Sequence, residues 1–152
     1  MAFKAYMKVC FGDIDNAGIV YYPRFVHYFH VALEDFFSAE LGIDYATLVR
    51  SHCLGLPTVH LEADFKRRLL YGDCLAVEVR IIDLGSTSVT WSFRVLREDD
   101  LVAEGSNTTV CVNLKTFQKT LPDWLRTLLE QYQKKCLLLE QVAHDHNAGE
   151  ES

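Results

Sequence analysis

A change of hydrophobic period constrains the fold of this chain more than any other feature. Over residues 3–11 the odd positions are apolar, which is the period of a β-strand with one buried face. The next apolar residues recur instead at helical spacing: Phe25, Tyr28, Phe29, Ala32, Leu33, Phe36 and Phe37. Pro23 suits the first turn of this helix and Gly42 its end. The chain therefore needs a surface that covers a long helix with an aromatic face.

Further alternating segments supply that surface, at 58–66, 75–83, 88–97 and 101–115. In the first of them the residues expected to face inward are Val59, Leu61, Ala63 and Phe65. Gly105 marks a candidate β-bulge in the last segment. A second helix is predicted over 121–139, and the polar sequence 141–152 is expected to form a mobile tail.

The order strand, helix, four strands, helix predicts an α+β fold. Consecutive strands with short connections favour an antiparallel sheet, and the apolar face of the first helix must pack against that sheet. The chain has 152 residues, the size of one ordinary domain, so we expect a single domain over residues 1–140.

Charge and composition exclude several classes of function. The formal net charge is −6, and no stripe dense in lysine and arginine opposes it, so nucleic acid is not an expected partner. No apolar run approaches the roughly 20 residues that span a bilayer, and no signal peptide is visible, so we expect no membrane contact and a cytoplasmic location. The five cysteines are irregularly spaced without a C-x-x-C pair, which favours buried free thiols.

The loop GDIDNAG at 12–18 carries the densest group of unusual residues. Its two carboxylates, Asp13 and Asp15, precede a helix start, where free N–H groups carry partial positive charge. Such donors can polarise a carbonyl while a carboxylate attacks the carbon or activates water. The pattern is compatible with acyl-transfer chemistry. The alternative is that Asp13, Asp15 and Asn16 are ordinary turn and capping residues.

Other clusters favour structural roles. His27, His30 and Glu34 share one face of the predicted helix, but no second cluster completes a ligand set, and no metal site is predicted. The pair His52 and Cys53 lacks a residue to orient it, which favours a packed loop thiol over a nucleophile. No G-x-S-x-G motif is present, so a serine hydrolase of the α/β type is not expected.

The stretches GDIDNAGIVYYPRF, LPTVHLEADF and YGDCL resemble the 4-hydroxybenzoyl-CoA thioesterase branch of the hotdog-fold acyl-CoA thioesterases. The chain is also similar to the 1,4-dihydroxy-2-naphthoyl-CoA hydrolases, through Pro57-Thr58-Val59-His60. The resemblance implies a hotdog fold, in which a five-stranded antiparallel sheet wraps around one long helix, here followed by a C-terminal helix. It implies hydrolysis of an acyl-CoA with an aryl or bulky apolar acyl group to the free acid and CoA. It implies no metal or bound cofactor and a homodimer or homotetramer.

The resemblance also assigns roles within the loop. Asp15 matches the catalytic carboxylate, as nucleophile or general base, and the backbone N–H of Tyr22 matches the donor that polarises the thioester carbonyl. Asp13 and Gly18 match positions that support the loop.

One departure from the family concerns CoA binding. An arginine pair that contacts the CoA phosphates in the hydroxybenzoyl branch is replaced here by Gly85-Ser86. The cations available instead are Lys66, Arg67, Arg68, Lys115 and Lys119, unless these are solvated surface charges. Two alternatives therefore stay open: a thioesterase acting on an acyl carrier protein, and a hotdog module that binds acyl thioesters without cleaving them.

Overall fold

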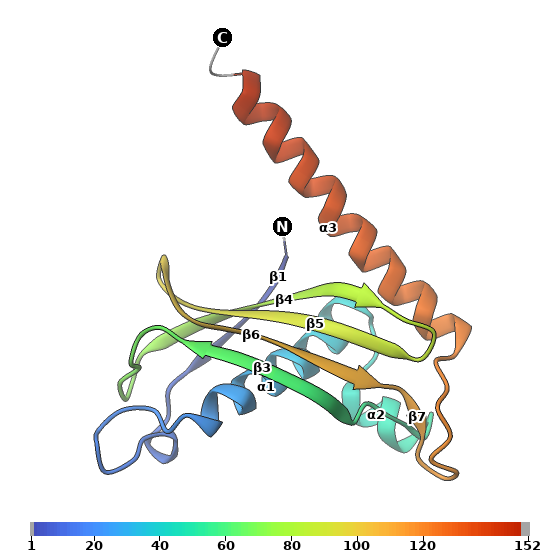
Figure 1. Cartoon of the computed structure of the whole chain (residues 1–152), viewed down its shortest axis with the longest axis horizontal. Coiled ribbons are helices and arrows are strands. Elements are labelled where there is room, and N and C mark those ends of the chain that lie inside the picture. Colours follow the sequence, from blue (N-terminus) through green and yellow to red (C-terminus); the bar gives the residue numbers. More distant parts are fainter. Residues whose placement is uncertain (1, 150–152) are drawn as a thin grey trace.

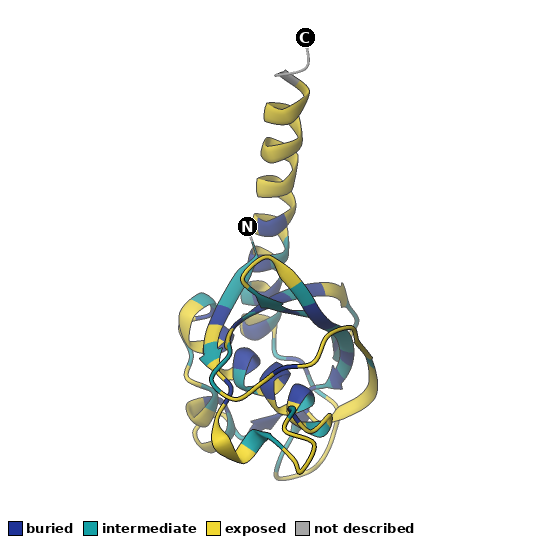
Figure 2. Ribbon diagram, turned by 90° about the vertical axis from the view of Figure 1, so that its left-hand side faces the viewer, coloured by how far each residue is buried: buried dark blue, intermediate teal, exposed yellow. Residues whose placement is uncertain are grey.

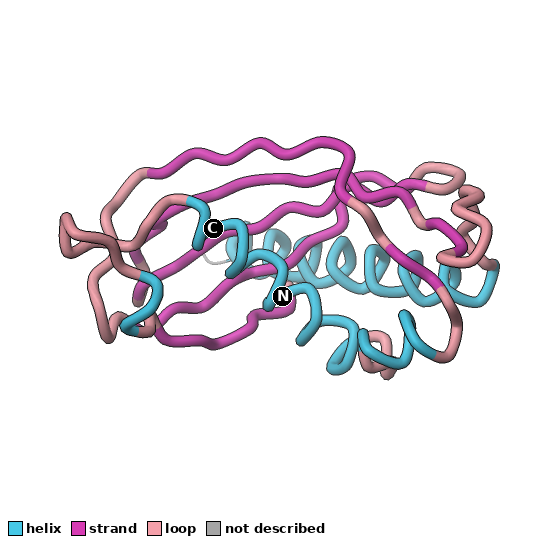
Figure 3. Tube along the Cα trace, turned by 90° about the horizontal axis from the view of Figure 1, so that it is seen from below, coloured by secondary structure: helices cyan, strands magenta, loops and turns pink. Residues whose placement is uncertain are grey.

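The structure, a computed structural model, describes residues 2–149 and is built around one antiparallel sheet. The strands lie in the order β1 (Phe3–Lys8), β4 (Cys74–Leu84), β5 (Ser88–Arg97), β6 (Asp100–Val110) and β3 (Thr58–Phe65). Helix α1 (Pro23–Glu40) lies along one face of the curved sheet (Figures 1 and 3). The predicted fold class, a five-stranded antiparallel sheet wrapped on a long helix, is confirmed.

Aromatic packing joins α1 to the sheet. All seven residues of the predicted apolar face are buried. The ring of Phe29 stacks on Phe93 of β5, with centroids 4.8 Å apart and an interplanar angle of 8°. Further along the helix, Phe36 meets Trp91 edge-on at 5.5 Å. These rings fill the space between the helix and the sheet and pack α1 against β5.

The prediction of a β-bulge at Gly105 is wrong. Gly105 pairs in regular register with Ala63 of β3 and Phe93 of β5. Irregularities occur elsewhere, including one between Thr58 and His60. A glycine stands at 105 because a Cβ there would lie 2.8 Å from the ring of Phe29 and 2.6 Å from a backbone oxygen of β3.

Strand β3 differs from its predicted burial. Val59, Leu61 and Phe65 were expected to face inward, but they are 63%, 41% and 47% exposed, and only Ala63 is half-buried. The reason is topological, because β3 is an edge strand that pairs with β6 alone. The single chain therefore leaves apolar side chains of an edge strand uncovered, the usual situation at a contact between copies.

Helix α3 (Asp123–Gly149) runs past its predicted end. The helix predicted over 121–139 continues to Gly149, into the sequence expected to form a mobile tail, and residues 150–152 lie outside the described part of the chain. No proline interrupts residues 141–149, and helical hydrogen bonds need no tertiary partner, so the helix begun at Asp123 can continue although most of these residues are not strong helix formers. Its turns beyond Cys136 project from the body and are exposed (Figure 2).

Several short elements were not predicted: the 3-10 turn η1 (Phe11–Asp13), helix α2 (Tyr45–Arg50) and a two-stranded sheet of β2 (Leu54–Gly55) with β7 (Val112–Asn113). The first and last predicted strands accordingly end earlier than expected, at Lys8 and Val110. Within residues 2–149, none of the helices has the length and apolar character needed to cross a membrane.

Candidate active site

The loop between η1 and α1 folds into a small hairpin that holds Asp15. The Tyr21 N–H donates to the carbonyl of Asp13 at 2.9 Å, and the Asp15 N–H donates to the carbonyl of Ile19 at 3.1 Å. At the tip, the Gly18 N–H donates to the carbonyl of Asp15 at 3.0 Å. Gly18 has φ +78°, a conformation that favours glycine, and this allows the turn at the tip of the hairpin.

The Asp15 side chain is exposed and only half engaged. Its Oδ1 accepts the N–H of Ala17 at 2.8 Å. No partner for its Oδ2 occurs in residues 2–149. One carboxylate oxygen is therefore oriented by the loop, while the other is free to meet a carbonyl carbon or a water molecule.

The start of α1 provides a free backbone donor beside this loop. Tyr22 directly precedes the helix, and its carbonyl already accepts the N–H of Phe25 at 3.2 Å. Its own N–H has no acceptor among the residues that the structure describes. Because the partial charge at a helix N-terminus is positive, this N–H is suited to an oxygen that gains negative charge.

Asp13 is engaged inward, in contrast to Asp15. Its Oδ2 accepts the Cys10 N–H at 2.8 Å and the Tyr28 hydroxyl at 3.0 Å. Its Oδ1 lies 3.9 Å from Nε of Arg24. The first carboxylate of the motif thus ties the loop to the body, whereas the second is presented outward.

A cavity of about 290 Å³ adjoins the helix start. It is lined by Ile19, Val20, Tyr22, Phe25, Phe65, Lys66, Arg67 and Arg68. Its apolar wall comes from Phe65, whose ring centroid lies 5.1 Å from that of Phe25 and 6.4 Å from that of Tyr22. Two larger hollows, about 810 and 400 Å³, lie along α3 and contain no residue of the loop. The small cavity therefore has an aromatic wall and a cationic rim and is lined by Tyr22, whereas Asp15 is not among its lining residues.

The segment after β3 holds that rim in place. The N–H groups of Lys66 and Arg67 both donate to the carbonyl of Val102, at 2.8 and 3.0 Å. Lys66 also pairs with Glu104 at 3.4 Å. The guanidinium groups of Arg67 and Arg68 have no partner within residues 2–149, so they remain available to an anion.

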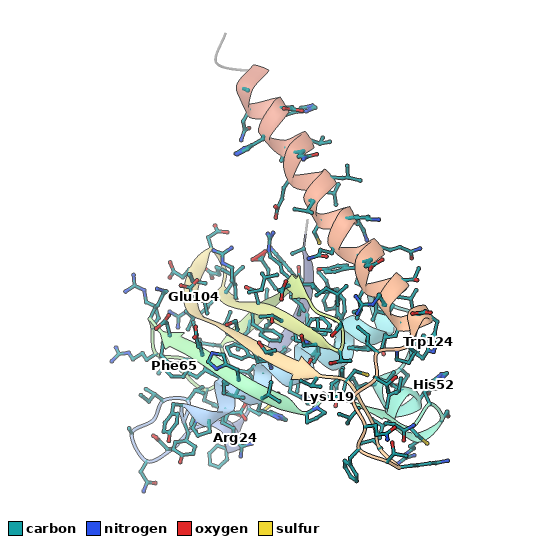
Figure 4. All side chains as sticks on the ribbon, turned by 45° about the vertical axis from the view of Figure 1, so that its right-hand side comes forward. Arg24, His52, Phe65, Glu104, Lys119 and Trp124 are labelled. Atoms are coloured by element: carbon teal, nitrogen blue, oxygen red, sulfur yellow. The ribbon has the colours of Figure 1, made fainter. Side chains whose placement is uncertain are left out.

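The other two predicted cations lie elsewhere. Lys115 and Lys119 both follow β7, and neither lines the cavity beside Tyr22. Figure 4 shows Lys119 at the end of the sheet away from Phe65 and Arg24. The single chain therefore brings together three of the five predicted phosphate contacts and separates the remaining two.

An arginine that sequence analysis missed reaches the turn that lacks the family's arginine pair. Nη2 of Arg126, on α3, donates to the carbonyls of Gly85 and Ser86, each at 2.6 Å. Since about forty residues separate Arg126 from this turn, no spacing pattern in the sequence could indicate the contact.

The remaining polar clusters have structural partners. His30 lies 3.0 Å from Glu34 within α1, and the ring of His52 packs against Trp124 at 4.8 Å. No group of three or more His, Cys, Asp or Glu side chains in the described part of the chain is arranged to hold a metal.

A sheet wrapped around α1, with this loop at the start of the helix, is the arrangement of the hotdog-fold thioesterases. Comparison with known proteins agrees with this class. The sequence profile described as "Thioesterase-like superfamily" matches residues 9–130. A 1,4-dihydroxy-2-naphthoyl-CoA hydrolase of Crocosphaera subtropica is 31% identical over 125 residues, or 77% of this chain and 90% of that protein.

Solved structures agree as well. A 1,4-dihydroxy-2-naphthoyl-CoA thioesterase from Synechocystis superposes with a TM-score of 0.76 at 26% identity, covering 85% of this chain and 96% of its own. A gentisyl-coenzyme A thioesterase gives 0.74 at 28% identity, over 82% and 99%. The chain belongs to the thioesterase-like superfamily, and it is a thioester hydrolase.

Proposed function

We propose that this protein hydrolyses an aryl-CoA thioester to the free acid and CoA, with Asp15 as the catalytic carboxylate. The observation that carries the proposal is the pairing of a half-free carboxylate at Asp15 with the free N–H of Tyr22 at the start of α1. The relatives named for 1,4-dihydroxy-2-naphthoyl-CoA and gentisyl-CoA support an aromatic acyl group.

In the proposed complex the thioester carbonyl accepts a hydrogen bond from the Tyr22 N–H, next to the positive end of α1. If Asp15 is the nucleophile, its oxygen attacks the carbonyl carbon, the CoA thiolate leaves with the electron pair of the C–S bond, and water then cleaves the anhydride. If Asp15 is a general base, it takes a proton from the attacking water, and the departing thiolate is protonated. In both routes the N–H stabilises the oxyanion.

The cationic rim suits the other end of the substrate. Arg67 and Arg68 present planar guanidinium groups beside the cavity, and each such group can donate two parallel hydrogen bonds to a phosphate. We propose that these residues, with Lys66, contact the CoA phosphates, and that Lys115 and Lys119 reach CoA only if a second copy brings them to the site.

The test compares two substitutions in one loop, using thiol release from a panel of aryl, short, medium and long acyl-CoAs. Asp15→Asn keeps the shape of the side chain but removes its charge, so kcat should fall about 10²- to 10⁴-fold with a smaller change in KM. Asp13→Asn keeps an oxygen that can accept from Cys10 and Tyr28. It should lower stability or raise KM and retain a measurable kcat, with a loss of about 10-fold or less.

A folded Asp15→Asn variant with near wild-type kcat would refute the catalytic assignment, as would a larger kcat loss in Asp13→Asn. Two other outcomes separate the alternatives. Thiol release from acyl carrier protein but not from any acyl-CoA would establish the carrier protein as the substrate. Binding of acyl-CoA without thiol release would indicate a binding module.

A further inference from the structure

Tyr28 is a buried tyrosine whose hydroxyl meets the active-site loop rather than the core. It lies on α1, is only 4% exposed, and packs its ring against Phe25 at 6.0 Å. Its hydroxyl donates to Oδ2 of Asp13 at 3.0 Å. Burial, followed by this bond to Asp13, raises the pKa of Tyr28, so the group stays protonated and remains a donor at any working pH.

Asp13 connects this tyrosine to both parts of the proposed site. The Tyr21 N–H donates to the Asp13 carbonyl, which makes Asp13 and Tyr21 the first rung of the loop hairpin. The second rung is the bond from the Asp15 N–H to Ile19. A displacement of Asp13 would therefore shift Asp15 on one side of the hairpin and the peptide that carries the Tyr22 N–H on the other.

We propose that Tyr28 is a positioning residue, which acts through Asp13 to hold the Asp15 carboxylate and the Tyr22 N–H in one fixed relative geometry. The inference rests on the proposed function, because it assumes that these two groups act together on a thioester. Tyr28 is not among the residues that line the cavity beside Tyr22, and its hydroxyl is engaged by Asp13, so the proposal assigns it no contact with substrate.

This arrangement predicts a particular kinetic effect. The cavity wall and its cationic rim include Phe65, Arg67 and Arg68, none of which contacts Tyr28 through a hydrogen bond. Phe25 also lines the cavity, but it meets the ring of Tyr28, which Tyr28→Phe retains. Loss of the tyrosine hydroxyl should leave substrate binding almost unchanged. It should instead loosen the alignment of the reacting groups, and a misplacement of about 1 Å can cost a factor on the order of 10² in rate.

The experiment compares Tyr28→Phe with Tyr132→Phe. Tyr132 is also 4% exposed, and its hydroxyl donates to the Val79 carbonyl at 2.6 Å and accepts the Phe3 N–H at 2.9 Å, away from the loop. Tyr28→Phe should lower kcat about 10-fold with KM within about 2-fold. Tyr132→Phe should lower thermal stability at least as much, while kcat stays within about 2-fold.

Hydrogen exchange supplies a readout that does not depend on turnover. Amides in the peptide 11–22, including that of Tyr21, should exchange faster in Tyr28→Phe than in the wild type, and they should be unchanged in Tyr132→Phe. Two results would overturn the positioning role and leave the proposed function standing. One is an equal loss of kcat in both variants, and the other is an unchanged kcat in Tyr28→Phe while Asp15→Asn is inactive. If the wild type cleaves no thioester, the proposed function fails, and unchanged exchange in Tyr28→Phe would then refute the anchoring as well.

Discussion

Helix α1 approaches the sheet closely at Gly105, and this contact yields a prediction about stability. In a Gly105→Ala variant the new Cβ would lie 2.6 Å from the carbonyl oxygen of Glu62 and 2.8 Å from the ring of Phe29. The first of these atoms is backbone, and the second belongs to a ring stacked on Phe93. Neither can move away without displacing β3 or the central aromatic packing.

The magnitude follows from the cost of overpacking. An extra methyl group in a well-packed core costs about 1–3 kcal/mol, and here two rigid neighbours are met at once, which favours the upper end, about 3 kcal/mol. For a chain of this size 1 kcal/mol shifts Tm by about 2–4 °C. Gly105→Ala should therefore lower Tm by about 6–12 °C.

The assay is thermal and urea unfolding at one fixed protein concentration, since association would make Tm depend on concentration. Gly12→Ala is the control, because a Cβ at Gly12 would meet nothing within 4 Å and this glycine does not have a positive φ. We expect the control to be neutral or slightly stabilising. An unfolding free energy of Gly105→Ala within experimental error of Gly12→Ala would refute the argument from the close approach.

Three other predictions concern charge, thiols and assembly. A hydrogen bond from the Leu70 N–H, and after it the Arg97 guanidinium, holds the pKa of Asp73 below its ordinary value. Asp73 therefore stabilises the fold above its unfolded pKa of about 3.9, and this stabilisation is lost as pH falls through the folded pKa. The difference in unfolding free energy between wild type and Asp73→Asn should shrink below about pH 4. No cysteine is catalytic: replacing the five singly by Ser or Ala should leave kcat within about 3-fold, and one folded variant without turnover would contradict this. Light scattering at micromolar concentration should show that the chain is at least a dimer, and Leu61→Lys should weaken the association. A wild-type protein that is active as a monomer would refute this prediction.

Local sequence patterns predicted much of this fold because the relevant physics is local. The helical spacing on α1 identifies its buried face, since all seven of those residues are buried. The alternating segments likewise locate the strands within a few residues. The loop can be recognised in the sequence because its carboxylates and glycines stand next to a helix start. The structure places Asp15 on the loop hairpin and Tyr22 directly before the helix.

The predictions that failed depend on contacts that local patterns do not encode. The alternation on β3 is correct as a strand pattern, but its burial depends on whether another strand lies beyond it. The five cysteines were expected to be buried thiols, but Cys10 and Cys74 are exposed and Cys53 is half-buried. Cys74 begins β4 at the end of the sheet, whereas Cys111 and Cys136 are buried as expected, and burial raises the pKa of Cys111 to about 11. Tyr28 was placed correctly on the buried face, yet nothing in its spacing indicates that its hydroxyl reaches Asp13.

The exposed face of β3 and the candidate site are parts of one surface. Leu61, Ala63 and Phe65 are every second residue of β3, so their side chains point to the same side of the sheet. Their partners on β6 are likewise every second residue: Asn107, Gly105 and Ala103. Phe65, at one end of this row, is also the aromatic wall of the cavity beside Tyr22. We therefore expect that a second copy covering β3 would also close the cavity from that side, which would link assembly to substrate binding through the apolar residues left uncovered in the single chain.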